Sequence, residues 1–201
     1  WTVYHGGMNA AARPLFGNGL LYINSADGPS PLVAVKPDGQ GDISKNIVWK
    51  TTKQVPKRSS QILVGDTLYM MNDSGVASCL DAKTGDEIWS RRLPGGQYWS
   101  SPLLADGLIY CFSQDGDMQV FKAAREFESV AENKLAEGSS ASPIVAGKSL
   151  IVRAQRRPGF ESDRFWLDVY DLATGAKRTV FESPDLSVGD YALSKDGQTV
   201  Y

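Results

Sequence analysis

A nine-residue phrase that occurs four times constrains the fold of this chain more than any single residue. Equivalent positions of the phrase, occupied by Leu15, Ile62, Leu103 and Ile144, are 47, 41 and 41 residues apart. Repeats of this length are typical of propeller blades, each of which is built from four short strands. The phrase reads PLFGNGLLY at 14–22, QILVGDTLY at 61–69, PLLADGLIY at 102–110 and PIVAGKSLI at 143–151.

Each phrase predicts a hairpin that is apolar on both faces. Its two apolar runs flank a pair of residues such as Asn-Gly or Asp-Gly, which adopt the positive φ of a tight turn. In the second run of the third phrase, Leu108 and Tyr110 point one way while Ile109 and Cys111 point the other. A sheet with two apolar faces must be covered on both. We therefore expect these sheets to stack face to face.

The second half of each repeat predicts another hairpin. An Asp-x-x-Thr-Gly turn occurs at 81–85 and again at 171–175. The Asp carboxylate can accept backbone N–H groups two residues on, and the Gly takes the left-handed conformation. The outgoing strand is more polar, as suits an outermost strand. A large apolar residue on that strand is expected to pack between blades, at Trp49, Trp89, Val130 and Val180.

The predicted fold is an all-β propeller of four-stranded antiparallel blades within a single domain, residues 1–201. The distance from Trp1 to Leu15 equals that from Trp89 to Leu103. We therefore predict that 1–13 holds the outer strand of a preceding blade and that 191–201 starts a following one. The four complete blades are predicted at about 14–59, 60–100, 101–141 and 142–190.

Two interpretations of the partial blades at both ends remain open. One is a fragment of a larger propeller, which we prefer. The other is a small ring whose last blade is completed by both termini. An open ring exposes strand edges and apolar blade faces, so self-association through those edges is a further expectation.

Two stretches of sequence resemble known propeller families. DAKTGDEIW, followed by SSPLLADGLIYCFSQDG, resembles the repeat of pyrroloquinoline-quinone (PQQ) proteins and of outer-membrane-assembly lipoproteins, over residues 1 to about 152. The remainder, to residue 201, is similar to the propeller of the prolyl oligopeptidase family of serine peptidases. There Ser194, Asp196 and Gly197 match its S-x-D-G motif.

These resemblances imply a propeller and a change of lineage near residue 152. Recombination, design or drift of one lineage would each explain such a change. Both families have many exported bacterial members, so the resemblance implies a periplasmic or secreted location. Because the sequence opens on Trp1 without a charged segment followed by an apolar one, we expect a signal peptide to be either absent or already removed.

Composition and charge exclude several classes of function. The formal net charge is −2, and Lys and Arg are scattered among acids, so nucleic-acid binding is not expected. No apolar run approaches the ~18 residues of a membrane-spanning helix. Cys79 and Cys111 are interpreted as buried small hydrophobic residues, with a disulfide as the alternative.

Candidate catalytic, metal and cofactor residues are few. His5 is the only histidine, and no Gly-x-Ser-x-Gly elbow occurs. The PQQ dehydrogenases have adjacent cysteines beside the quinone, whereas Cys79 and Cys111 are 32 positions apart. Asp115 and Asp117 could offer oxygen atoms to calcium, but a hairpin turn is the preferred interpretation. We expect no catalytic residue, metal or cofactor.

The loops on one face of the propeller are the predicted binding site. Links between blades and loops between second and third strands share that face, where Asp73 and Gln114 also lie. Aromatic and Arg side chains anchor many protein partners, although Tyr98 and Trp99 could instead fold back onto the blade. The arm at 156–164 is longer than its counterparts. The candidate partner-binding residues are Lys57, Arg58, Tyr98, Trp99, Arg156, Arg157, Phe160 and Asp163.

The sequence therefore predicts a non-catalytic scaffold that binds a protein or peptide, or a polysaccharide, through this face. The alternative is an accessory propeller that gates substrate access to a serine peptidase. That alternative needs a hydrolase domain with the catalytic triad, which this sequence does not contain. The chain by itself is not expected to be an enzyme.

Overall fold

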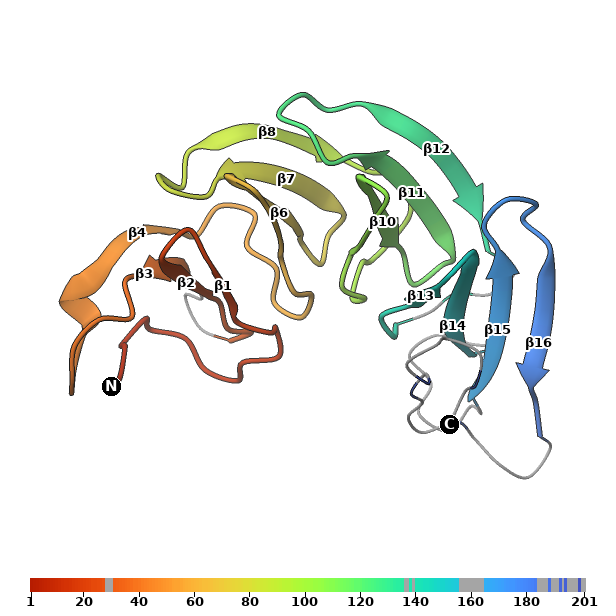
Figure 1. Cartoon of the computed structure of the whole chain (residues 1–201), viewed down its shortest axis with the longest axis horizontal. Helices are drawn as coiled ribbons and strands as arrows, with labels where there is room; N and C mark the ends of the chain where they lie inside the picture. The colour runs from red at the N-terminus through yellow and green to blue at the C-terminus, as the bar shows by residue number, and fades with distance from the viewer. Residues whose placement is uncertain are drawn as a thin grey trace.

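Four antiparallel sheets, each of four strands in chain order, make up the described part of the chain. The computed structural model describes residues 1–27, 31–135, 138, 140–155, 165–183, 188, 192, 194 and 199. Figure 1 shows the sheets following one another along an arc, with the first sheet at one end of that arc and the fourth at the other. The predicted fold of four-stranded propeller blades is confirmed.

The sheets are named blades one to four. Blade one contains β1 (Leu15–Gly17), β2 (Leu20–Ile23), β3 (Leu32–Val35) and β4 (Ile47–Thr51), with a short 3-10 helix, η1 (Ser44–Asn46), before β4. Blade two contains β5 (Ile62–Val64), β6 (Thr67–Met71), β7 (Val76–Asp81) and β8 (Glu87–Arg92). Blade three contains β9 (Leu103–Ala105), β10 (Leu108–Phe112), β11 (Asp117–Lys122) and β12 (Ser129–Lys134). Blade four contains β13 (Ile144–Ala146), β14 (Ser149–Gln155), β15 (Phe165–Asp171) and β16 (Lys177–Phe181).

The blades face one another through apolar side chains that alternate along the strands. Blades one and two share a buried cluster that includes Tyr22, Trp49 and Leu68. Blades two and three share a second buried cluster. Blades three and four are joined by a cluster that includes Phe112 and Leu150. Strand alternation therefore supplies two buried faces to each inner blade, as expected. The cluster between blades two and three includes Tyr69, Cys79, Trp89, Tyr98, Ile109, Cys111 and Phe121.

The two tryptophans anchor each blade to the next one. The Trp49 indole N–H of blade one donates to the Ala82 carbonyl of blade two, at 3.0 Å. The Trp89 N–H of blade two donates to the Ala124 carbonyl of blade three, at 3.1 Å. Both side chains are buried. Their predicted position between blades is confirmed, and each indole combines apolar burial with a satisfied donor.

The same prediction is wrong for Val130 and Val180, which are 47% and 40% exposed. In blade three, Val120 pairs with Ala131 and Phe121 pairs with Ser129, so Val130 is the extra residue of a bulge. Val180 is skipped in the same way, in the pairing of β15 with β16. A bulge moves every later residue to the other face of the strand. Blades one and two have the same bulge, with Trp49 and Trp89 paired beside the skipped residue. The count along the sequence therefore landed on the skipped residue of blade three instead of on Ala131.

Ala131 occupies the tryptophan position of blade three. The pairing of Trp89 with Cys79 in blade two corresponds to that of Ala131 with Val120. The interface between blades three and four therefore lacks an indole anchor of this kind.

The segment predicted as an outer strand at 1–13 forms no strand. The Thr2 N–H donates to the Gly41 carbonyl at 2.7 Å, and the Ile43 N–H donates to the Thr2 carbonyl at 2.9 Å. A second isolated bridge joins Met8 to Asp27. No further blade lies beside 1–13 among the residues described, so loops of blade one provide these hydrogen-bond partners.

The prediction of strands at 191–201 falls mostly outside the described residues. Ser194 N–H donates to the Thr199 carbonyl at 2.9 Å. Each of the four sheets lies within one predicted blade range. The extent of the domain and its partial blades remain predictions.

Both cysteines are free and buried. Cys79 and Cys111 belong to the cluster between blades two and three, so the interpretation as small hydrophobic residues is confirmed. The Asp115 to Asp117 segment is a hairpin turn. There the Ser113 N–H donates to the Asp117 carbonyl at 2.8 Å, and the Asp117 carboxylate pairs with Lys134.

Candidate functional site

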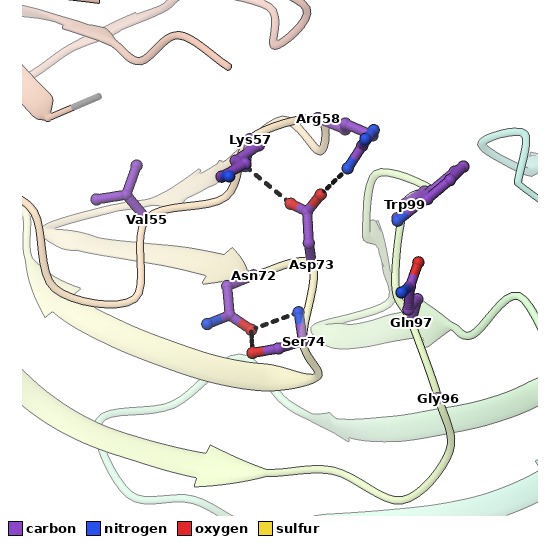
Figure 2. A pocket seen from close by; sticks show the side chains of 9 residues that line it. All are labelled: Val55, Lys57, Arg58, Asn72, Asp73, Ser74, Gly96, Gln97 and Trp99. Atoms are coloured by element: carbon purple, nitrogen blue, oxygen red, sulfur yellow. Dashed lines mark hydrogen bonds and ion pairs between the residues drawn. The ribbon is translucent and has the colours of Figure 1, made fainter. Parts of the chain in front are cut away.

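Three loops that border blade two meet on one face, and we call them the loop face. They are 52–61 between β4 and β5, 72–75 between β6 and β7, and 93–102 between β8 and β9. Figure 2 shows side chains from all three loops lining one hollow. Its volume is about 610 Å³. The lining residues are Val55, Lys57, Arg58, Asn72, Asp73, Ser74, Gly96, Gln97 and Trp99.

Arg58 lies at the centre of this group. Its guanidinium forms an ion pair with the Asp73 carboxylate and stands 4.2 Å from the centre of the Trp99 ring. The other Asp73 oxygen accepts the Lys57 backbone N–H at 2.9 Å (Figure 2). A cation on an indole face is stabilised by the ring quadrupole. Asp73 and Trp99 therefore orient Arg58 from two different loops.

A second hollow of about 510 Å³ lies next to the first, on the side of blade one. Lys57 and Arg58 line both hollows. They form a boundary between the two spaces, which we call the Lys57–Arg58 ridge. The other residues of the second hollow are Asn9, Ala10, Ala11, Ala26 and Asp27.

A buried polar network holds the ridge from below. The Asn24 side-chain N–H donates to the Pro56 carbonyl at 2.7 Å, and the Gln61 amide donates to Asn24 Oδ1 at 2.6 Å. The Ser59 hydroxyl donates to the Met71 carbonyl at 2.6 Å. Each of these donors is satisfied inside the protein, so the loop before β5 has a defined backbone position. Binding residues on such a loop are preorganised.

A repeated serine contact joins the blades near the start of each inner strand. The Arg13 N–H donates to Ser60 Oγ, the Ser60 N–H donates to Ser101 Oγ, and the Ser101 N–H donates to Ser142 Oγ, each at 2.9 Å. Sequence reasoning missed this series. The signal was present, because the three serines are spaced by 41 residues directly before the repeated phrase.

The structure brings together three of the predicted binding residues, Lys57, Arg58 and Trp99. Tyr98 was also predicted to bind a partner, and this prediction is wrong. Its side chain is 0% exposed, and its hydroxyl donates to the Pro94 carbonyl. The ring belongs to the apolar cluster between blades two and three, where it buries more surface than it would in a loop. The remaining candidates, Arg156, Arg157, Phe160 and Asp163, lie outside the described residues.

Two further residues of the face were placed by the structure. Gln114, expected on this face, donates its amide N–H to Ser140 Oγ at 2.8 Å and so links blades three and four. Gln97 lines the first hollow between Gly96 and Trp99. Nothing in its sequence context distinguished it from other loop residues.

The chemistry of the lining favours binding. Ser74 is the hydroxyl residue in the first hollow, and its Oγ donates to Asn72 Oδ1 at 3.1 Å. Among the residues described, no group of three or more His, Cys, Asp or Glu is placed to hold a metal ion. The described part of the chain also has no helix that is long and apolar enough to cross a membrane.

Residues 44–179 match the family model of outer membrane protein assembly factor BamB. The chain belongs to this family. The match passes the predicted change of lineage near residue 152 and continues to residue 179. Residues 153–179 therefore belong to the same BamB-type propeller as the residues before them.

Solved structures of BamB and of a dehydrogenase share the fold. The crystal structure of BamB from Moraxella catarrhalis superposes with a TM-score of 0.62 and 18% identity, covering 89% of this chain and 53% of that one. A europium-containing methanol dehydrogenase gives a TM-score of 0.61 and 12% identity, covering 87% of this chain and 42% of that one. At these identities the likeness concerns the fold alone.

This chain spans about half the length of the two solved structures. Comparison with curated proteins gave no match. None of the matches reported above is to a prolyl oligopeptidase, so that resemblance is not supported.

Proposed function

We propose that this chain is a non-catalytic propeller that binds a protein or peptide partner across the loop face. The observation that carries the proposal is the stacking of Arg58 on Trp99 at the mouth of a hollow built by two blades. Arg and Trp are the residue types most enriched among binding hot spots. Here both are held in place before any partner arrives.

The family supports the kind of partner. BamB is named as an outer membrane protein assembly factor, which favours a partner among the proteins of that process and a periplasmic location. A gating role for a serine peptidase has no observation in its favour. A catalytic role has little support in the first hollow, because the Ser74 hydroxyl is bonded to an amide oxygen rather than to a base.

Site-specific photo-crosslinking in cells tests this proposal. A photoreactive amino acid replaces Gln97 on the loop face or, as a matched control, Lys83, which is exposed in the turn between β7 and β8. We expect defined crosslinked proteins from position 97 and none of the same proteins from position 83. Trp99→Ala should remove the crosslinks from position 97.

Identical crosslinks from both positions would contradict a specific face. Crosslinks that survive Trp99→Ala would show that the stacked Arg58 and Trp99 do not carry the binding. Thermal unfolding of each variant controls for loss of the fold.

A further inference from the structure

We propose that the Lys57–Arg58 ridge binds a side-chain carboxylate of an acidic peptide segment, and that Asp73 competes with that carboxylate for Arg58. This inference rests on the proposed function and assigns a chemical class to the ligand. It also assigns to Asp73 the role of an internal competitor that sets the affinity of the site.

The first step is the charge of the hollow. Lys57 and Arg58 provide two cations, and Asp73 provides the one carboxylate among the lining residues given above. Asp73 pairs with Arg58. The Lys57 side chain is exposed, and its ammonium forms no ion pair with any residue that the structure describes. Lys57 is therefore the uncompensated charge among the lining residues, and it favours an anionic ligand on the ridge side of the hollow, away from the Asp115 carboxylate beside Gly96.

The second hollow is less suited to the carboxylate. Asp27 lines it, and the Asp27 carboxylate accepts a hydrogen bond from Asn9. A second anion there would be repelled. The ligand carboxylate is therefore assigned to the first hollow, on the Trp99 side of the ridge.

The second step is what Asp73 already does. One of its oxygens binds the Arg58 guanidinium and the other accepts the Lys57 backbone N–H. These are charge-assisted or backbone donors of the kind that any incoming carboxylate seeks. Asp73 occupies them from within the same face, at the tip of the loop between β6 and β7. Its side chain is 22% exposed, so an approaching ligand can reach the pair.

The third step concerns the remainder of the ligand. Val55 and the Trp99 ring offer apolar contact, and the Gln97 amide can donate to or accept from a peptide backbone. An extended segment that alternates acidic and aromatic residues can contact all of these groups. Its acidic side chains face the ridge, its aromatic side chains pack on Val55 and Trp99, and its backbone bonds to Gln97. Polar specificity beside an aromatic anchor is a common design of peptide sites.

Fluorescence anisotropy with two short, capped and labelled peptides tests the inference on the whole chain. One peptide alternates glutamate with phenylalanine and serine, and the other has glutamine in place of every glutamate. We expect the acidic peptide to bind at least about tenfold more tightly, a difference of about 1.4 kcal/mol. The advantage should shrink at high salt, because exposed charges are screened.

Variants that are expected to change the affinity in opposite directions make the test specific. Lys57→Gln should weaken binding of the acidic peptide by about three- to tenfold, and Arg58→Gln by more. Asp73→Asn keeps an acceptor for the Lys57 N–H and removes the competing charge, so it should tighten binding by about three- to tenfold. Lys50→Gln makes the same charge change as Lys57→Gln, on β4 away from the hollow, and should leave the affinity unchanged.

Equal affinity for the two peptides, or weaker binding by Asp73→Asn, would overturn the inference. Should Asp73→Asn disturb the loop, as judged by thermal unfolding, the ranking of Arg58→Gln, Lys57→Gln and Lys50→Gln still decides. Loss of peptide binding together with intact, Trp99-dependent crosslinks at position 97 would overturn this inference and leave the proposed function standing. Absence of peptide binding together with absence of Trp99-dependent crosslinks at position 97 would overturn the proposed function as well.

Discussion

The interface between blades two and three and the interface between blades three and four join similar sheets by different chemistry. In the former, the Trp89 ring lies 6.1 Å from Tyr69, 5.7 Å from Phe121 and 5.2 Å from Phe127, measured between ring centres. Its N–H reaches the next blade. In the latter, Ala131 occupies the equivalent position. The four repeats are therefore not energetically equivalent.

Blade four brings a buried charge to its interface beside its aromatic rings, and the Trp166 indole N–H donates to that charge, the Asp168 carboxylate, at 3.1 Å. Strand alternation puts Asp168 on the same side of β15 as Tyr170, which packs with the cluster between blades three and four. Asp168 is 0% exposed. Its carboxylate pairs with Lys177 at 2.9 Å and accepts the Thr179 hydroxyl at 2.7 Å. Apolar contact stabilises in proportion to its area, whereas a buried charge stabilises only while all its partners remain.

The largest expected effect is that of Trp89→Ala. Removal of the ring leaves a cavity between blades two and three and an unpaired Ala124 carbonyl, so unfolding should become easier by about 3–5 kcal/mol. Urea denaturation followed by fluorescence or circular dichroism measures this change. Val130→Ala, at the exposed bulge of blade three, is the control and should stay within about 0.5 kcal/mol. A loss below about 1 kcal/mol for Trp89→Ala would contradict its role as an anchor.

Alanine substitution of the turn glycines, Gly85 and Gly175, compares two blades. The turn of blade two contacts the Trp49 indole of the preceding blade, and the turn of blade four contacts no indole among the residues that the structure describes. Gly85 has φ +78°, and a Cβ there would lie 2.7 Å from the Trp49 ring. Gly175 has φ +71° and open space around it. Gly175→Ala should cost about 1–2 kcal/mol from the backbone alone. Gly85→Ala should cost about 1–3 kcal/mol more, because the indole must move.

A double-mutant cycle with Trp49→Ala checks the cause of that difference. In the Trp49→Ala background, the two glycine substitutions should have similar effects on the urea midpoint. A difference that persists without the indole would assign the cost to something other than the contact between blades.

Asp168→Asn probes the polar interface with a smaller effect. The substitution keeps the shape of the side chain but leaves the Lys177 ammonium without its buried counter-charge. We expect a loss of about 1–3 kcal/mol in the free energy of unfolding. The control is Asp66→Asn, whose partner Lys83 and whose own side chain are both more than half exposed. That variant should change stability by less than about 1 kcal/mol.

Alkaline pH should weaken the interface between blades two and three through Cys79. Burial raises the pKa of the Cys79 thiol from about 9 to about 11, so the folded state holds the proton more tightly than the unfolded chain. Its contribution to stability is therefore complete below about pH 9 and is lost between about pH 9 and about pH 11. Urea denaturation across this range should show a shallower decline for Cys79→Ala than for the unchanged chain. Equal declines would contradict the assignment.

Sequence reasoning succeeded where the signal was periodic and failed where the register changed. The repeated phrase, the Asp-x-x-Thr-Gly turns and the positions of Trp49 and Trp89 were all predicted. Val130 was mistaken for the third anchor because the interval from this position to the next phrase varies by one residue. It is 13 from Trp49 to Ile62, 14 from Trp89 to Leu103 and 13 from Ala131 to Ile144. A shift of one residue selects the opposite face of a strand.

The candidate site was predicted only in part. Lys57, Arg58 and Trp99 were selected because they are charged or aromatic residues in loops. Tyr98 was selected for the same reason, yet its ring is buried. Neighbouring residues in a loop can point in opposite directions, and only the packing of blades two and three decides which one is covered.

By itself, the sequence determined the blade, because strand alternation, turn chemistry and repeat length are properties of neighbouring residues. The tertiary structure decided the site. Arg58, Asp73 and Trp99 belong to three loops that meet only once blades two and three have stacked. Which cation meets which carboxylate, and which aromatic ring stays at the surface, depends on distances between segments that the order of residues does not encode locally.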